Sequence, residues 1–152
     1  PNAGILKNEI VSDIPKWIIS NKDVKRGDYI VQGLESHQID YIILAGFLRK
    51  IPDEVVLKYE NRIINIHPAL VPKYGGKGLY GLYVHEAVFE AKETESGITI
   101  HFVNEHYDEG QIIFQATIDI SACKNSDEIA QKVLSLEHYY FPIIINQVVN
   151  QS

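Results

Sequence analysis

The pattern of apolar and polar positions predicts helices that alternate with strands along the chain. Helical spacing of apolar residues occurs in 3–11, 28–37, 52–59, 79–91 and 126–150, the last interrupted near Pro142. Continuous runs of strand-forming residues cover 16–20, 41–47 and 62–66, and partly alternating runs cover 97–103 and 111–120. Continuous runs are typical of strands covered on both faces, whereas alternation favours more exposed, antiparallel edge strands. This order predicts an α/β fold with a mostly parallel sheet and flanking helices.

The composition fits one soluble domain that covers residues 1–152. The net charge is −6, the pI is near 5.5 and the basic residues are scattered, which disfavours nucleic acid as a partner. The single cysteine, Cys123, cannot form an intrachain disulfide, which favours a reducing, cytoplasmic location. No apolar stretch reaches the roughly 18 residues that a membrane span needs, so we expect no membrane partner.

The segment RIINIHPALVPKYGGKG, residues 62–78, changes from a strand to a glycine-rich loop just after Asn65 and His67. Because side chains alternate along a strand, these two point to the same side. An amide can hold a carbonyl oxygen, and an imidazole can move a proton near neutral pH. The pair also lies at the carboxyl end of a strand, where α/β sheets bind ligands. The alternative is that Asn65 merely ends the strand and that His67 is hydrogen-bonded beneath the loop.

A second polar cluster lies between two predicted strands, in residues 101–113. Its loop carries Asn104, Glu105, His106, Asp108 and Glu109, followed by a flexible turn at Gly110. Loops between sheet strands often carry catalytic groups, and one of these carboxylates could orient a histidine or bind a water. The alternative is a solvated acidic hairpin.

The remaining histidines and glycines indicate no metal or phosphate site. We expect His85 and His138 on helix surfaces. The spacing of His101 and His106 matches no established metal-ligand signature, so no metal is expected. The stretch KYGGKG at 73–78 lacks the terminal Lys-Ser/Thr of a P-loop, and we interpret 73–83 as a mobile loop near the site.

Four blocks of sequence carry a resemblance that extends over most of the chain. They are ILAGFLRKIP at 43–52, INIHPALVPKYGGKG at 64–78, ESGITIHFVNEHYDEGQII at 95–113 and LEHYYFP at 136–142. Together they resemble the folate-dependent formyltransferase family, in particular its members that act on glycinamide ribonucleotide. The resemblance implies a Rossmann-like formyltransferase fold. It also implies transfer of a formyl group from 10-formyltetrahydrofolate, as co-substrate, to the amine of glycinamide ribonucleotide in purine biosynthesis.

The resemblance implies a catalytic trio of Asn65, His67 and Asp108. Asn65 and His67 would donate to the oxyanion that develops on the formyl oxygen, a form of electrostatic help that is often the largest catalytic contribution. Asp108 would hold His67 charged, because an adjacent carboxylate raises the pKa of an imidazole, or would bind the water that shuttles the proton. No metal is needed.

Further site residues follow from the same resemblance. The folate would contact Leu44, Arg49, Ile51, Val56, Asn104 and Asp108. The substrate would contact Pro68 and Glu137, and Thr99 and His101 would support the site from the preceding strand. Each position has an alternative: the three aliphatic residues would be core in any α/β domain, and Glu137 would be a surface acid on the last helix.

The chain also departs from the family pattern. Members begin with a strand and a glycine-rich loop that grips the ribonucleotide phosphate, and neither precedes Pro1, so we expect an N-terminally incomplete catalytic domain. The alternatives are a formyltetrahydrofolate deformylase and a non-catalytic folate-binding member. A relative that formylates methionyl-tRNA suits this acidic chain less well, since its partner is a nucleic acid. We expect small-molecule partners and a monomer or homodimer.

Overall fold

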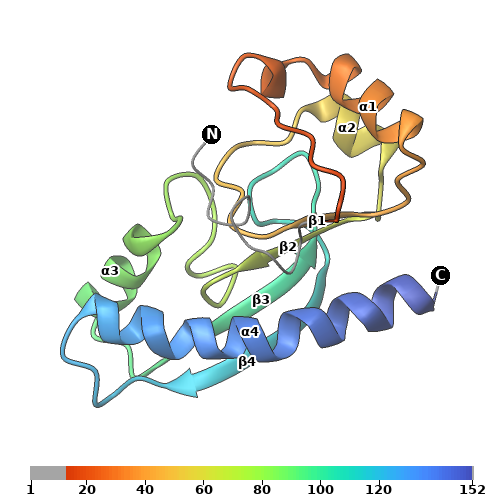
Figure 1. Cartoon of the computed structure of the whole chain (residues 1–152). Helices are drawn as coiled ribbons and strands as arrows, with labels where there is room; N and C mark the ends of the chain where they lie inside the picture. Colours follow the sequence, from red (N-terminus) through yellow and green to blue (C-terminus); the bar gives the residue numbers. More distant parts are fainter. Residues whose placement is uncertain (1–12, 152) are drawn as a thin grey trace.

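The sheet of the protein has four strands in the computed structural model, which describes residues 13–151 (Figure 1). They are β1 (Ile42–Leu44), β2 (Ile63–His67), β3 (Glu95–Phe102) and β4 (Ile112–Asp119), in that order across the sheet. β1 and β2 are parallel, whereas β2 with β3 and β3 with β4 are antiparallel. The α/β class is therefore confirmed. The described sheet is mixed, and the expected predominance of parallel pairs is not found in it, because a short loop joins β3 directly to β4.

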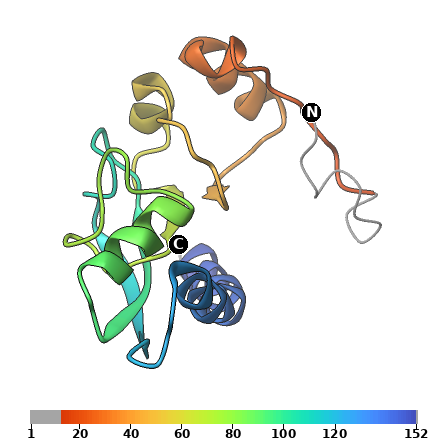
Figure 2. The same cartoon turned by 90° about the vertical axis from the view of Figure 1, so that its left-hand side faces the viewer.

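Helices flank this sheet on different sides (Figures 1 and 2). They are the 3-10 helix η3 (Asp23–Lys25) and the α-helices α1 (Gly27–Ser36), α2 (Asp53–Lys58), α3 (Leu82–Glu90) and α4 (Ser126–Asn150). The long α4 crosses one face of β3 and β4, and α3 packs against α4. α1 and α2 contact each other at the end of the sheet where β1 lies.

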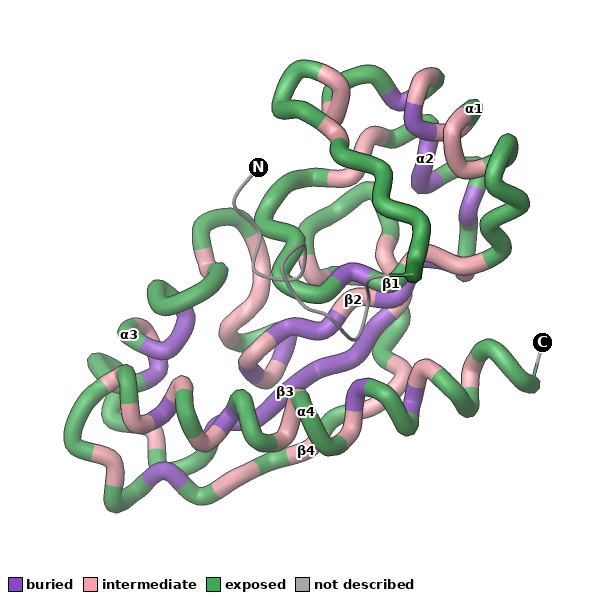
Figure 3. The backbone as a smooth tube through the Cα atoms, in the orientation of Figure 1, coloured by how far each residue is buried: buried purple, intermediate pink, exposed green. Residues whose placement is uncertain are grey.

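Two apolar clusters hold these layers together. The larger one lies between β2 to β4 and the helices α3 and α4, and it includes Ile98 and Val133. The smaller one joins α1 and α2 to β1 and β2 through Ile30 and Val55. Figure 3 shows β2 and β3 as the most continuously buried segments. The expected exposure of 97–103 is therefore wrong, because β3 has a strand on each side and α4 on one face, whereas β4 does alternate as predicted.

Successive side chains of β2 lie on opposite faces of the sheet. Ile64 and Ile66 belong to the larger apolar cluster beneath α4. Asn65 and His67 alternate with them and therefore point to the opposite face. The polar positions of β3 alternate with Ile98 in the same way. One face thus packs beneath α4, whereas the other carries the polar side chains beside the smaller apolar cluster, which includes Ile63.

The last helix begins with a defined cap and continues through its proline. The side chain of Asn125 accepts a hydrogen bond from the backbone N–H of Glu128, as an N-cap residue does. Pro142 lies within the continuous helix, so the predicted interruption there is wrong. Pro142 is exposed, whereas Phe141 and Ile144 beside it are buried in the larger cluster. Tertiary packing of these neighbours offsets the backbone hydrogen bond that a proline cannot make.

Two predicted strands at the start of the chain differ from the structure. Residues 16–20 form no strand, and Trp17 instead packs edge-on against Tyr29 of α1, with ring centroids 5.6 Å apart. The run 41–47 gives only the three residues of β1, and Ile43 in it is 36% exposed. The face of β1 that carries Ile43 is therefore not fully covered, in contrast to the expectation for this strand. The helix predicted at 3–11 lies outside the described residues.

Length and apolar character decide which helices can cross a bilayer. Within residues 13–151, none is both long enough and apolar enough to cross a membrane.

His85 of α3 is buried rather than on the helix surface, which corrects the prediction. Its side chain is 5% exposed, and its Nδ1 atom has no hydrogen-bond partner. The residue lies one turn before the fully buried Val88, so both share the inward face of α3. Burial lowers the pKa of His85, and the neighbouring His67 lowers it further. The folded protein therefore favours the neutral form of this imidazole.

This burial predicts that the protein loses stability in mild acid. Below about pH 6.5 the unfolded chain binds a proton at His85 that the folded protein does not, so the free energy of unfolding falls as pH decreases. Replacing His85 with Gln removes this difference and should flatten the pH dependence by up to about 1.4 kcal/mol per pH unit. Urea unfolding at pH 5 to 8 measures it, with the exposed His138→Gln as control. If the free energy of unfolding depends on pH equally in His85→Gln and in the unmodified protein, His85 is not the cause of the loss of stability.

Candidate active site

The pairing of β2 with β3 brings four polar side chains onto one face of the sheet. Asn65 lies opposite His101, and His67 lies opposite Thr99. Directly opposed residues in an antiparallel pair have Cβ atoms about 5 Å apart, so their side chains interact. Three of the four, His67, Thr99 and His101, are buried. The predicted pair and its two predicted supporting residues therefore form one compact group.

Asp108 reaches this group from the loop between β3 and β4. Its Oδ2 atom lies 3.6 Å from Nδ1 of His67, and its Oδ1 atom lies 3.6 Å from Nε2 of His101. The loop folds back tightly at Gly110, where an added Cβ would lie 1.7 Å from the carbonyl oxygen of Phe102. Asp108 itself has a φ of 56°, a left-handed conformation that is uncommon for a residue with a side chain. The amide, the imidazole and the carboxylate thus meet, although they come from two separate segments.

The hydrogen bonds of His101 orient the amide of Asn65. Nδ1 of His101 donates to the carbonyl of Phe102 at 2.8 Å, which leaves Nε2 of the neutral ring as an acceptor. Nδ2 of Asn65 donates to that Nε2 atom at 3.1 Å. An amide nitrogen carries two hydrogens, so one N–H of Asn65 is left to donate to a ligand oxygen.

Both nitrogens of His67 face acceptors. Nε2 donates to the carbonyl of Tyr74 at 2.6 Å, which assigns a hydrogen to Nε2 because a carbonyl only accepts. Nδ1 faces Asp108 at 3.6 Å, beyond direct hydrogen-bond distance. Burial lowers the pKa of His67, and it outweighs the opposing effects of Asp108 and of the Tyr74 carbonyl. One of the two predicted roles of Asp108 is to hold His67 charged. In the absence of ligands, the carboxylate does not do this at neutral pH.

Asp108 remains an anion within this buried group. Burial raises its pKa, but the neighbouring His101, the charge on His67 and the backbone N–H of Gly76 together lower it below the ordinary value. The N–H of Gly76 donates to Oδ2 at 3.0 Å. Because His67 favours its neutral form, the hydrogen bond from Gly76 is the cause that does not depend on the charge of that ring. A neutral imidazole beside a carboxylate can accept a proton and then be stabilised as a cation.

Thr99 supports the loop that follows β2 rather than facing the cleft. Its Oγ1 atom donates to the carbonyl of Ala69 at 2.7 Å and accepts from the N–H of Val71 at 3.2 Å. Gln115 of β4 adds hydrogen bonds from Nε2 to Oγ1 of Thr99 at 2.9 Å and to the carbonyl of Val71 at 3.0 Å. These bonds fix the path of the chain beyond His67.

A cleft of about 740 Å³ opens next to the group. Most of the predicted ligand contacts line it: Leu44, Arg49, Ile51, Asn65, His67, Pro68, His101, Asn104, Asp108 and Glu137. Glu137 reaches it from α4, and burial raises the pKa of this carboxyl, against a smaller lowering by His138. Glu137 is therefore not an ordinary surface acid. Residues 76–82 of the predicted loop also line the cleft, which places that loop at the site.

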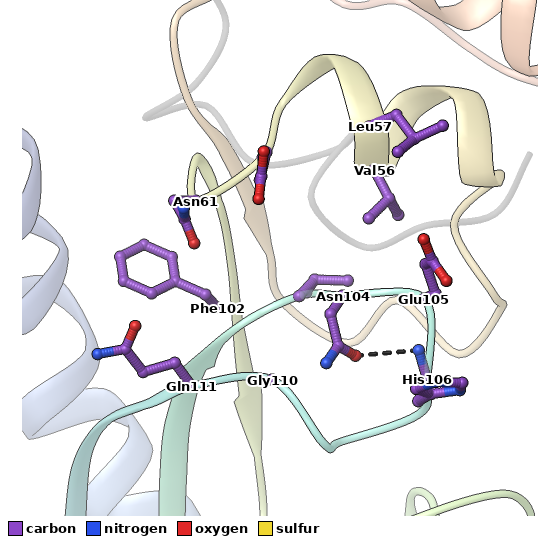
Figure 4. A pocket seen from close by; sticks show the side chains of 11 residues that line it. Val56, Leu57, Asn61, Phe102, Asn104, Glu105, His106, Gly110 and Gln111 are labelled. Carbon is purple, nitrogen blue, oxygen red and sulfur yellow. Dashed lines mark hydrogen bonds between the residues drawn. The ribbon is translucent and has the colours of Figure 1, made fainter.

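Val56 does not line the main cleft, in contrast to the other predicted folate contacts. It lines a second cavity of about 300 Å³ that Figure 4 shows between α2 and the loop after β3. In this view Val56 and Leu57 project from the helix, and Asn104 accepts a hydrogen bond from the N–H of His106 at 2.9 Å. Val103, Asn104 and His106 line both cavities. The residues after β3 therefore form the wall between the two spaces.

Four groups at the site were not identified from the sequence. They are the carbonyl of Tyr74, the N–H of Gly76, the side chain of Gln115 and the buried ring of His85. Gln115 had a detectable signal, since it is the polar residue that directly follows three apolar ones in this strand. Backbone groups have no such signal. Among the described residues, no cluster of three or more His, Cys, Asp or Glu could hold a metal ion.

Known proteins resemble this chain in sequence. The profile of the family described as formyl transferase matches residues 3–145. The chloroplastic phosphoribosylglycinamide formyltransferase of Arabidopsis thaliana is 43% identical over 122 residues, which are 80% of this chain and 42% of that protein. The phosphoribosylglycinamide formyltransferase of Bacillus subtilis (strain 168) is 32% identical over 153 residues, covering 98% of this chain and 76% of that protein. The chain thus spans less than half the length of the plant relative.

Solved structures agree with the sequence comparison. The glycinamide ribonucleotide transformylase 1 of Geobacillus kaustophilus has a TM-score of 0.85 at 28% identity, over 97% of this chain and 78% of that one. The phosphoribosylglycinamide formyltransferase of Coxiella burnetii has a TM-score of 0.78 at 35% identity, over 91% and 65%. The family match covers nearly the whole chain, and the predicted fold agrees with these structures. The chain therefore belongs to the formyl transferase family.

Proposed function

We propose that the protein transfers a formyl group from 10-formyltetrahydrofolate to the amine of glycinamide ribonucleotide, a step of purine biosynthesis. The observation that carries the proposal is the meeting of Asn65, His67 and Asp108 at the wall of one cleft in a formyl transferase. We further propose that it acts as a single catalytic domain in the cytoplasm, as a monomer or homodimer, without a metal.

The reaction places negative charge on the formyl oxygen as the amine attacks the formyl carbon. The free N–H of Asn65 donates to this oxygen, since its other N–H is held by His101. His67 provides a second donor once Nδ1 is protonated. Hydrogen bonds that are stronger to the transition state than to the ground state are the ones that increase the rate.

The proton that the amine loses must reach the folate nitrogen that leaves. His67 starts neutral, with its hydrogen on Nε2 fixed by Tyr74, so Nδ1 accepts the amine proton. The Asp108 carboxylate stabilises the resulting imidazolium. The same proton then passes to the leaving nitrogen as the bond between carbon and that nitrogen breaks. One N–H is lost and one is gained, so no net proton is consumed.

The family resemblance implies the ligand contacts, and the lining of the two cavities supports most of them. Leu44 and Ile51 would provide apolar contacts for the folate, and Arg49 and Asn104 also line the main cleft. Val56 reaches the folate only through the adjoining cavity, past the wall at Asn104. The amine of the substrate lies near Pro68, with the Glu137 carboxylate available to hold it.

An assay with 10-formyltetrahydrofolate tests the function directly. The protein in its full length should consume formyl-folate only when glycinamide ribonucleotide is present, and formylated product should appear in equal amount. Consumption without the ribonucleotide would indicate a deformylase. No consumption in either case, with binding of the folate retained, would indicate a non-catalytic member and refute the proposal.

Replacing His67 with Ala should lower turnover by roughly two orders of magnitude or more, because the donor and proton acceptor at the reacting centre is lost. Steady-state kinetics with both substrates measures this. His37→Ala, at an exposed position after α1 that lines neither cavity, is the matched control and should keep its turnover. Turnover of His67→Ala near that of the control would show that His67 has another role.

Replacing Asp108 with Asn should lower the pKa of His67 further, because the charge that opposes burial is removed. Turnover should fall by at least about tenfold, the equivalent of one pKa unit of lost stabilisation of the imidazolium. NMR titration of the His67 ring measures the first effect and kinetics the second. Asp127→Asn, at an exposed position in the first turn of α4, is the control. An unchanged His67 pKa would mean that the two groups do not interact.

A further inference from the structure

The loop after Pro72 covers the His67 and Asp108 pair with backbone groups. The carbonyl of Tyr74 accepts from Nε2 of His67 at 2.6 Å. Two residues later, the N–H of Gly76 donates to Oδ2 of Asp108 at 3.0 Å. The position of residues 73–76 therefore decides which hydrogen bonds both side chains make.

Glu93 anchors this loop from outside the cleft. It lies after α3 and just before β3, and its Oε1 atom accepts from the Tyr74 hydroxyl at 2.6 Å and from Nζ of Lys73 at 2.5 Å. The Tyr74 ring also packs against the larger apolar cluster. The contact ties the loop to the turn between α3 and β3, 19 residues further along the chain. Glu93 does not line either cavity.

The charges at this anchor favour the contact across the neutral range. Burial and the hydrogen bond to Glu93 raise the pKa of Tyr74 to about 12, so the hydroxyl remains a donor. Hydrogen bonds from Lys73 and Tyr74 lower the pKa of Glu93, so it remains an ionised acceptor. Hydrogen bonds to a charged acceptor are stronger than those between neutral groups.

We infer that Glu93 and Tyr74 are positioning residues, which hold the Tyr74 carbonyl against Nε2 of His67 and so fix the hydrogen of that ring on Nε2. The role of this contact in catalysis rests on the proposed function, because a hydrogen fixed on Nε2 leaves Nδ1 as the nitrogen that exchanges the proton of the reaction. The structural role of the contact is independent of activity. The groups that face the His67 ring are Asp108 from the loop, His101 from β3 and His85 from α3.

Three variants separate the anchor from general stability. Tyr74→Phe keeps the ring and the backbone carbonyl but removes the hydroxyl that bonds to Glu93. Glu93→Ala removes the acceptor, whereas Glu93→Gln retains an oxygen that can accept from the hydroxyl. Glu35→Ala is the matched control, since Glu35 also forms a 2.5 Å pair with a lysine, Lys58, away from the site.

NMR of the protein with 15N-labelled histidine provides the decisive measurement. We expect a slowly exchanging N–H at Nε2 of His67 in the unmodified protein. Its exchange with solvent should be faster by on the order of three- to tenfold in Tyr74→Phe and Glu93→Ala, as for one lost hydrogen bond. It should be near the unmodified rate in Glu93→Gln and in the control. Equal rates in all variants, or a neutral ring with its hydrogen on Nδ1, would overturn the inference.

Kinetics then tests the catalytic consequence. With both substrates, kcat should fall on the order of three- to tenfold in Tyr74→Phe and Glu93→Ala with KM little changed, and Glu93→Gln should recover most of it. If exchange changes but kcat does not, the anchor orients the ring without serving catalysis, and the catalytic part is overturned. If the unmodified protein transfers no formyl group, the proposed function fails while the NMR result still decides the positioning role.

Discussion

The antiparallel register between β2 and β3 is the constraint on which the candidate active site depends. It sets Asn65 opposite His101 and His67 opposite Thr99. A shift of one residue would turn these side chains toward α4 and turn the packed face, with Ile64, out of the apolar cluster. The packing of the apolar side chains of each strand therefore fixes the positions of its polar side chains. A site that needs side chains placed to within about 0.5 Å can be built at such a pair because neither strand can slide.

Burial determines how the same residues titrate. The His67 ring lies in a region with little water, and the cost of removing its charge from solvent outweighs the attraction of Asp108. The carboxylate keeps its charge because it accepts a backbone hydrogen bond from Gly76 as well as facing the two rings. A neutral acceptor beside a fixed anion is suited to taking up a proton during a reaction and releasing it afterwards.

The segment from Ala69 to Gly76 connects the sheet to the site through backbone atoms. Thr99 and Gln115 hold its beginning from β3 and β4, and Glu93 holds its end. The side chains that do this lie on regular or packed parts of the fold, whereas the groups that meet His67 and Asp108 are a carbonyl and an N–H. Rigid elements thus position a loop that would otherwise be free to take many conformations.

From residue 28 onwards the sequence by itself determined the order of helices and strands, and it determined the residue types of the trio, because periodicity and the strand-end pair of Asn65 and His67 are local. It also predicted that Asp108 would join them, through the family resemblance. Only the tertiary structure decided that His85 is buried, that α4 continues past Pro142 and that burial leaves His67 neutral. These depend on which surfaces pack together and how much water remains. Likewise, the Tyr74 carbonyl has no signature in the sequence, since every residue carries one, and only the folded loop gives it a partner.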